Sequence, residues 1–257
     1  MAPPRFADIH CHLCAGLDDG PATMDEAVEM CRMAWLSGTW HIACVAHQGP
    51  QWPEVDRKAI AASCVELQKQ LKEQEIGIEV VPMGEVMIDV DLIDRLDQGE
   101  LMTVGDAGQY LLIEMPHNSY FDITMLVQQC AQRSVRPILA HAERYSQLLM
   151  SHGDIEHLIS LGVVIQVNAN SVLKLRGATL RALRAWFQRG IVHVIGSDGH
   201  GALRRRPIVA EAFDRVVDWT SFDVANELFY ENSARMLSGQ RVKLPVPARP
   251  KKRFWFL

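Results

Sequence analysis

The 257-residue chain lacks any long uninterrupted run of apolar residues. A membrane-spanning helix needs about 20 consecutive apolar residues, so we expect no transmembrane segment. Residues 1–5 also lack the apolar core of a signal peptide. These two absences predict a cytoplasmic protein. Hydrophobic residues make up 48% of the chain and charged residues 22%, which predicts a folded globular protein.

The sequence also has no excess of positive charge. The formal net charge is −5 and the isoelectric point is near 6.1. Proteins dedicated to nucleic-acid binding usually carry a basic face, so this balance argues against a nucleic-acid partner. An anionic substrate is still possible, because bound cations would make a carboxylate-rich site less negative.

The six cysteines follow no disulfide or zinc-binding pattern, and we expect them to be reduced and mostly buried. Cys11 and Cys14 form a single C-x-x-C, but no second C-x-x-C follows to complete a structural zinc site. A redox role is disfavoured because Cys11 should face away from its neighbours His10 and His12. A C-x5-R phosphate loop is absent too, since Cys130 precedes Arg136 by six positions.

Short apolar runs recur along the chain, and nearly every run ends at a residue that can bind a metal. His10 and His12 are two positions apart, so both imidazoles project from the same face of an extended segment. Asp19 joins the set because residues 17–20 closely follow the first run and turn back over it. The nine candidate ligands are His10, His12, Asp19, His47, Glu85, Glu114, His141, Asp198 and His200.

Segments with helical periodicity alternate with these apolar runs, which predicts βα units and a parallel sheet. We expect strands at residues 6–9, 40–46, 78–84, 110–113, 136–140, 163–167 and 191–197. We expect helices at residues 23–38, 58–72, 90–96, 123–133, 155–161, 179–189 and 208–217. Seven such units predict an α/β fold, a distorted TIM-like (β/α)7 barrel with its site at the carboxyl ends of the strands. An open doubly wound sheet is the alternative, but its ligands would gather at one switch point.

The composition changes after residue 242. Residues 1–242 are predicted to form one domain, and residues 243–257 form a tail that is proline-rich, then basic, then aromatic. The simpler interpretation is a tail that packs on the barrel or stays disordered. The alternative is peripheral docking at the inner face of a membrane, because basic residues beside Trp and Phe suit an anionic interface.

Five histidines and four carboxylates, without thiolates, suit manganese, iron or zinc. Nine ligands exceed what one ion needs and suffice for two or three. Ions about 3.5–4 Å apart can activate water and stabilise the charge on a phosphate ester during hydrolysis. Five other histidines have no place in this pattern, and we expect them in the core, at interfaces or in solvent: His41, His117, His152, His157 and His193.

Several motifs around these ligands resemble the PHP (polymerase and histidinol phosphatase) superfamily. They are Asp8-Ile-His-Cys-His12, Asp18-Asp-Gly20, Gly84-Glu85, Leu112-Ile-Glu114, Ala140-His-Ala-Glu-Arg-Tyr145 and Ser197-Asp-Gly-His200. Within it, residues 6–240 are similar to bacterial manganese-dependent protein-tyrosine phosphatases encoded with capsule and exopolysaccharide genes. The resemblance implies a PHP-type barrel in which the nine candidate ligands hold a trinuclear site.

The resemblance also implies substrate contacts and a partner. Arg144 and Arg206 match positions that would hold the substrate phosphate, with Arg205 as the alternative to Arg206. The implied substrate is a phosphotyrosine protein, namely a membrane-associated tyrosine autokinase. One departure is Gln48, where relatives often have a histidine or a basic residue.

Two other functions remain open at this point. One is a small-molecule phosphoesterase of the PHP type, acting on histidinol phosphate or a nucleotide. Short connections between the expected elements argue against it. The other is a non-catalytic PHP module for binding or polymerase proofreading. The complete ligand set and the negative charge argue against that module, so we favour the tyrosine phosphatase.

Overall fold

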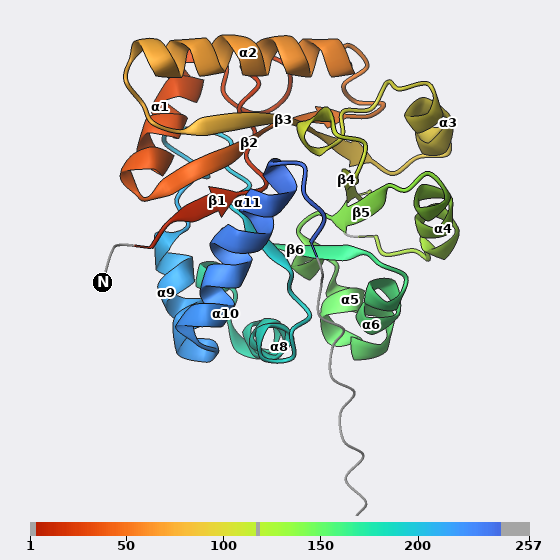
Figure 1. Ribbon diagram of the computed structural model, residues 1–257. Coiled ribbons are helices and arrows are strands. Elements are labelled where there is room, and N and C mark those ends of the chain that lie inside the picture. The colour runs from red at the N-terminus through yellow and green to blue at the C-terminus, as the bar shows by residue number, and fades with distance from the viewer. Residues whose placement is uncertain (1–3, 117–118, 243–257) are drawn as a thin grey trace, which may run out of the picture.

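The computed structural model describes residues 4–116 and 119–242 of the chain. Seven parallel strands form one sheet in the order in which they occur in the sequence (Figure 1). The strands are β1 (Phe6–Asp8), β2 (Thr39–Gln48), β3 (Glu79–Met87), β4 (Tyr110–Glu114), β5 (Arg136–Leu139), β6 (Val164–Asn168) and β7 (Val194–Gly196). This sequential order excludes the doubly wound alternative, in which the strand order reverses at a switch point.

The two ends of the sheet meet and close the barrel. The amide of Asp198 donates a hydrogen bond to the carbonyl of His10 at 2.7 Å, and the amide of Ser197 donates to Asp8 Oδ1 at 2.9 Å. Gly196 permits this approach, because a Cβ there would lie only 2.5 Å from the Cβ of His10. The predicted distorted (β/α)7 barrel is therefore confirmed, with β7 brought against the segment that follows β1.

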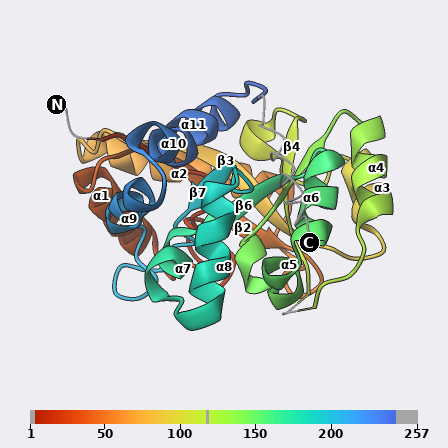
Figure 2. The same ribbon diagram turned by 90° about the horizontal axis from the view of Figure 1, so that it is seen from below.

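Helices surround the barrel (Figures 1 and 2). They are α1 (Met24–Leu36), α2 (Arg57–Glu73), α3 (Leu92–Asp97), α4 (Thr124–Gln132), α5 (Ser146–Met150), α6 (His152–Ser160), α7 (Ala169–Lys174), α8 (Gly177–Gln188), α9 (Ala210–Trp219), α10 (Phe222–Asn226) and α11 (Asn232–Leu237). Short turns of other helix types are η1 (Val104–Asp106), η2 (Ala142–Arg144) and η3 (Glu227–Glu231). Thr23 caps α1 by accepting from the amide of Glu26, and Asp56 caps α2 by accepting from the amide of Ala59.

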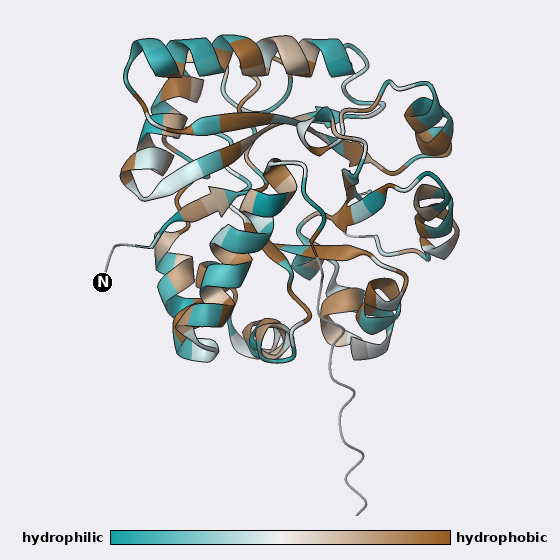
Figure 3. Cartoon of the chain, viewed as in Figure 1, coloured by the Kyte–Doolittle hydropathy of each residue, from teal (hydrophilic) through white to brown (hydrophobic). Residues whose placement is uncertain are grey.

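Apolar side chains fill both the inside of the barrel and the layer between strands and helices. Figure 3 shows hydrophobic, brown stretches in the strands, and helices in which brown and teal residues alternate. Met236 and Leu237 of α11 join the cluster inside the barrel. Nearby, Asn232 Nδ2 donates to the carbonyl of His193, just before β7, at 3.0 Å. Helix α11 therefore closes the barrel at the end opposite the carboxyl ends of the strands.

Each expected strand and helix is present in the described residues, with boundaries shifted by a few positions. The sequence analysis predicts none of α5, α7, α10 and α11. The predicted tail, residues 243–257, lies outside the described residues, so its separation from the domain stays a prediction. Within the described ranges, every helix is too short or too polar to cross a membrane.

Candidate metal centre

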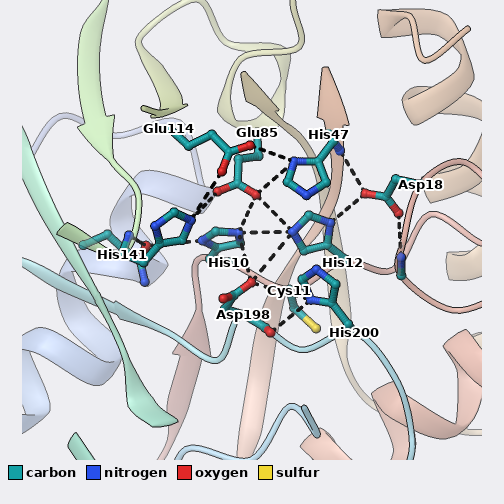
Figure 4. Close-up of polar contacts among 12 residues, drawn as sticks. His10, Cys11, His12, Asp18, His47, Glu85, Glu114, His141, Asp198 and His200 are labelled. Atoms are coloured by element: carbon teal, nitrogen blue, oxygen red, sulfur yellow. Dashed lines mark hydrogen bonds and ion pairs between the residues drawn. The ribbon is translucent and has the colours of Figure 1, made fainter. Parts of the chain in front are cut away.

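The nine candidate ligands converge at the carboxyl ends of the strands (Figure 4 labels eight of them). His47, Glu85 and Glu114 lie within β2, β3 and β4, and the others follow β1, β5 and β7. Parallel register aligns them, because His47 pairs with Glu85 and Met87 pairs with Glu114. The βα repeat thus delivers one to three ligands from almost every strand, or from the segment after it, to one end of the barrel.

Glu85 lies at the centre of the group and is 1% exposed. Its Oε2 is 3.1 Å from the Nε2 atoms of both His10 and His12, and its Oε1 is 3.0 Å from His141 Nε2. Burial would raise the pKa of Glu85, but the surrounding histidines hold it well below its usual range. The carboxylate is therefore ionised and positioned to bridge cations.

Three overlapping groups have ligand atoms within 4.8 Å of one another, which is close enough to share an ion. The groups are His12, Asp19, His47 and His200; His10, His12 and Asp198; and His47, Glu85 and Glu114. His141 stands outside the three groups but lies 3.7 Å from Glu114 Oε2 through its Nε2 atom. The structure thus brings all nine residues together, and their role as metal ligands stays a prediction.

Hydrogen bonds on the outer nitrogens orient three of the imidazoles. Asp18 Oδ2 is 2.6 Å from His12 Nδ1, and Gln166 Oε1 is 3.3 Å from His10 Nδ1. The carbonyl of Asp198 is 3.1 Å from His200 Nδ1. A metal-ligating histidine usually donates its other N–H to such an acceptor, which leaves Nε2 free to bind. These contacts fix the ring orientation that metal binding requires.

The fit to cations also follows from the inward-facing atoms. With their Nδ1 atoms engaged elsewhere, His10 and His12 point Nε2 at each other across 3.3 Å. Two lone pairs at that distance repel unless a proton or a metal ion lies between or beside them. Burial would lower the pKa of His12, yet hydrogen bonds to Asp18 and Glu85 raise it to about 9. The donor set therefore attracts positive charge, and divalent ions fit it.

Two of the nine residues adopt left-handed backbone conformations, which are uncommon for residues other than glycine. His141 has φ of 33° and Asp198 has φ of 53°. Gln166 Oε1 accepts from the amide of His141 at 2.6 Å, and the amide of Asp198 is held by His10 as described above. Strain of this kind clusters at functional sites, where the surrounding structure over-determines it.

Asp18, Gln166 and Asn168 are functional candidates that the sequence analysis does not assign to the site. Asp18 also accepts from the amides of His47 and Gly20, so it ties its loop to β2. Asn168 Nδ2 donates to Asp198 Oδ2 at 2.7 Å. The sequence places Asp18 beside Asp19 and Asn168 at a strand end. Neither position tells whether the residue would bind a metal or would hydrogen-bond to a residue that does.

The arginines divide differently from the expectation based on the resemblance. Arg144 and Arg205 both line the pocket over the candidate ligands, and each forms an ion pair with Asp198. Arg206 is exposed and is not among the residues that line this pocket. The reason is the turn after β7, in which the amide of His200 donates to the carbonyl of Arg205 at 2.9 Å and Arg205 adopts φ of 50°.

Gln48 lines the pocket, but the hydrogen bonds of its side chain go to backbone groups. Its Oε1 accepts from the amide of Met102 at 2.8 Å, and its Nε2 donates to the carbonyls of Val55 and Glu100. Gly84 makes room for it, because a Cβ there would lie 2.3 Å from Gln48 Oε1. Gln48 therefore anchors the segment that follows β2.

The remaining expectations concern histidines and cysteines. His41 pairs with Glu79, His157 is exposed beside Thr124, and His193 is buried and accepts from the amide of Ile165. His152 begins α6, and His117 lies outside the described residues.

All six cysteines are free and buried, as expected. Burial raises the pKa of the Cys11 thiol well above its usual value, which makes it a poor nucleophile.

A cavity of about 480 Å³ opens above the ligands. Its wall includes Glu85, Glu114 and Asp198, the two pocket arginines, and several apolar side chains. The site thus combines clustered metal-binding atoms, cationic groups and an apolar surface in one open pocket.

Comparisons with known proteins identify the family of the chain. The family model described as capsular polysaccharide synthesis, CpsB/CapC, matches residues 6–238. The tyrosine-protein phosphatase CpsB of Streptococcus pneumoniae is 26% identical over 242 residues, covering 91% of this chain and 99% of that protein. The tyrosine-protein phosphatase YwqE of Bacillus subtilis is 25% identical, covering 97% of this chain and 99% of that protein.

Solved structures give the same relationship. A crystal structure reported for YwqE from Bacillus subtilis and CpsB from Streptococcus pneumoniae, described as metal-dependent tyrosine phosphatases, matches with a TM-score of 0.87 and 25% identity. The match covers 96% of this chain and 100% of that one. A dihydropyrimidinase from Brevibacillus agri, 12% identical with a TM-score of 0.54, shares the fold alone over 95% of this chain and 74% of its own. The chain belongs to the CpsB/CapC family of capsular polysaccharide synthesis.

Proposed function

We propose that the protein is a metal-dependent tyrosine phosphatase that acts in capsule or exopolysaccharide synthesis. The observation that supports this proposal is the packing of three candidate metal-binding groups around Glu85, in a pocket that also presents two arginines. The family and the names of the full-length relatives support the same reaction.

The proposed cofactor is two or three divalent ions, with manganese favoured over iron and zinc. Imidazole and carboxylate donors without thiolates suit all three metals. The preference for manganese is what the resemblance to manganese-dependent phosphatases implies. Such ions supply Lewis acidity and lower the pKa of water, which provides the nucleophile for phosphate ester hydrolysis. The nine residues would hold the ions, and Asp18 and Gln166 would orient the imidazoles.

Arg144 and Arg205 are the proposed phosphate contacts, with Arg205 in place of Arg206. A guanidinium presents a planar fork of donors that can bind two phosphate oxygens and neutralise the charge that develops in the transition state. Both arginines are partly exposed at the pocket and are held by Asp198 in the structure. Their mobility in solvent would let them turn from Asp198 to a phosphate.

The proposed protein substrate is a membrane-associated tyrosine autokinase, whose tyrosine phosphate esters this enzyme would hydrolyse in the cytoplasm to free tyrosine side chains and inorganic phosphate. The tail at residues 243–257 could add peripheral docking at the membrane, and its separation from the 1–242 domain is part of this proposal. Both ideas rest on the family and on the composition of the tail.

The test is hydrolysis of a phosphotyrosine peptide by manganese-loaded protein, compared with histidinol phosphate, a nucleotide and a phosphoserine peptide. We expect the phosphotyrosine peptide to have the highest kcat/KM and chelation to abolish its turnover. Cys130→Ser should retain activity, since no thiol takes part. Preference for histidinol phosphate or the nucleotide would instead indicate a small-molecule phosphoesterase.

A further inference from the structure

The lining of the active pocket is divided around the barrel. Trp52 follows β2, Met87 and Ile88 come from the end of β3, and Met115 follows β4. The two pocket arginines instead follow β5 and β7. Because the strands are arranged in sequential order, these apolar side chains occupy one sector of the rim and the two arginines occupy another, which also contains Tyr145. A ligand that fits both sectors has an anionic end and an apolar end.

Trp52 is the aromatic residue of the apolar sector, and it lies beside the candidate ligand His47. Its indole is parallel to the imidazole of His47 within 4°, with ring centroids 6.1 Å apart. Two turns hold it: its amide donates to the carbonyl of Gly49 at 2.9 Å, and its carbonyl accepts from the amide of Val55 at 3.1 Å. Gln48 fixes the far end of this segment through the carbonyl of Val55. The segment that carries the indole is therefore held in place, and the indole itself is only partly buried.

The side chain of Trp52 also lines a neighbouring cavity of about 830 Å³, which shares residues 48–50 and Asp89 with the active pocket. If a phosphorylated side chain of a protein substrate occupied the active pocket, the neighbouring cavity would have room for the polypeptide that carries it. This arrangement favours a side chain presented by a protein over a compact metabolite.

We propose that Trp52 is a specificity-determining residue, which packs against the tyrosyl ring of the substrate and selects aryl over alkyl phosphate monoesters. The inference rests on the proposed phosphatase function. Aromatic pairs gain energy from ring geometry in addition to the apolar area that they bury. An alkyl phosphate reaches the cations and arginines equally well but leaves the indole uncovered.

The experiment measures binding of phenylphosphonate and methylphosphonate to the manganese-loaded full-length protein by calorimetry. These probes share the anionic end and are not hydrolysed at a phosphate ester. Wild type should bind phenylphosphonate more tightly. Trp52→Ala should weaken phenylphosphonate binding roughly tenfold and leave methylphosphonate binding unchanged. Trp52→Phe should restore most of the difference.

The matched control is Trp40→Ala. Trp40 lies at the other end of β2, is 42% exposed and stacks with Arg5, so its loss removes an indole remote from the pocket. We expect this variant to bind both probes like wild type. Manganese content is measured in every variant, because Trp52 also contacts His47.

Three results would overturn the inference. The first is that Trp52→Ala weakens the binding of both probes equally, and the second is that it weakens the binding of neither. The third is that Trp52→Ala loses manganese while Trp52→Phe keeps it, which would make Trp52 a positioning residue for His47. Turnover of the phosphotyrosine peptide by wild type is measured separately. Its absence would contradict the proposed function, whereas a probe preference that ignores Trp52 would contradict only this inference.

Discussion

Asp18 controls the imidazole of His12 without being one of the nine candidate ligands. Asp18→Asn removes the charge opposite His12 Nδ1, 2.6 Å away, and weakens the preference for the ring orientation that directs Nε2 inward. Loss of such a supporting contact typically costs 10–100-fold in metal affinity. We therefore expect a manganese affinity about 10–100-fold lower, measured by metal titration of the chelated protein, with a parallel loss of turnover at limiting manganese.

The control for Asp18→Asn is Asp25→Asn, an exposed carboxylate in the first turn of α1. It removes the same charge from the same part of the chain without touching an imidazole. Wild-type manganese affinity in both variants would show that Asp18 has no part in the metal centre.

The turn after β7 places Arg205 in the wall of the pocket, whereas its neighbour Arg206 is not among the lining residues. Arg144→Ala and Arg205→Ala should each lower kcat/KM for a phosphotyrosine peptide by roughly 2–4 kcal/mol of transition-state stabilisation and leave bound manganese intact. Lysine at either position should rescue only part of the loss, because it keeps the charge but not the planar fork. Arg206→Ala is the internal control and should behave like wild type in steady-state kinetics.

The opposite ranking, with Arg206→Ala impaired and Arg205→Ala normal, would show that the turn rearranges when substrate binds.

The choice between these residues could not be made from the sequence. Three consecutive arginines look alike there, and only the hydrogen bond from His200 to the carbonyl of Arg205 decides which one faces the pocket.

At the scale of elements, the strands could be predicted because each is an apolar run that ends in a polar group. Repetition at regular intervals also predicted that the nine residues meet. The helices that were missed are short and depend on tertiary contacts: α11 has six residues, and its Met236 and Leu237 are buried only because they close the barrel. Trp52 was missed for a similar reason, since no periodic pattern covers the turn that holds it.

Helices α3 and α4 are joined by a surface ion pair in which Arg133 donates to both carboxylate oxygens of Asp97. These hydrogen bonds lower the pKa of Asp97 from its ordinary value near 3.8. The unfolded state therefore binds more protons than the folded state below that pH, so the contribution is present above about pH 4 and is lost as the pH falls further.

The expected result is a small Tm deficit in Asp97→Asn at pH 7 that disappears as the pH falls below about 4. The effect is small because the pair is exposed to solvent. Thermal unfolding across pH 3–7 measures it, with the exposed Asp218→Asn on α9 as control. A deficit that grows toward acid pH would contradict the assigned direction of the pKa shift.

At the scale of the whole molecule, the candidate metal centre links nearly every βα unit, since its ligands come from six of the seven strands or the segments that follow them. Glu85 and the histidines around it are buried, and the carboxylates raise the pKa of His47 to about 11 despite burial that would lower it. Without cations, the carboxylates in the folded barrel would therefore repel one another unless the neighbouring histidines were protonated. Metal binding and folding should be coupled.

Removing the metals should accordingly lower the Tm of the whole domain. Cations that bind the folded barrel and hardly the unfolded chain add about 2.7 kcal/mol per independent site at 100 times the dissociation constant. For a chain of this size that corresponds to a Tm rise of roughly 5–10 °C per site. Calorimetry of chelated and manganese-loaded protein measures the difference. Glu85→Gln, which removes the shared carboxylate, should make the Tm much less sensitive to manganese. An identical Tm with and without chelator, at unchanged metal content, would contradict a metal centre built from these residues.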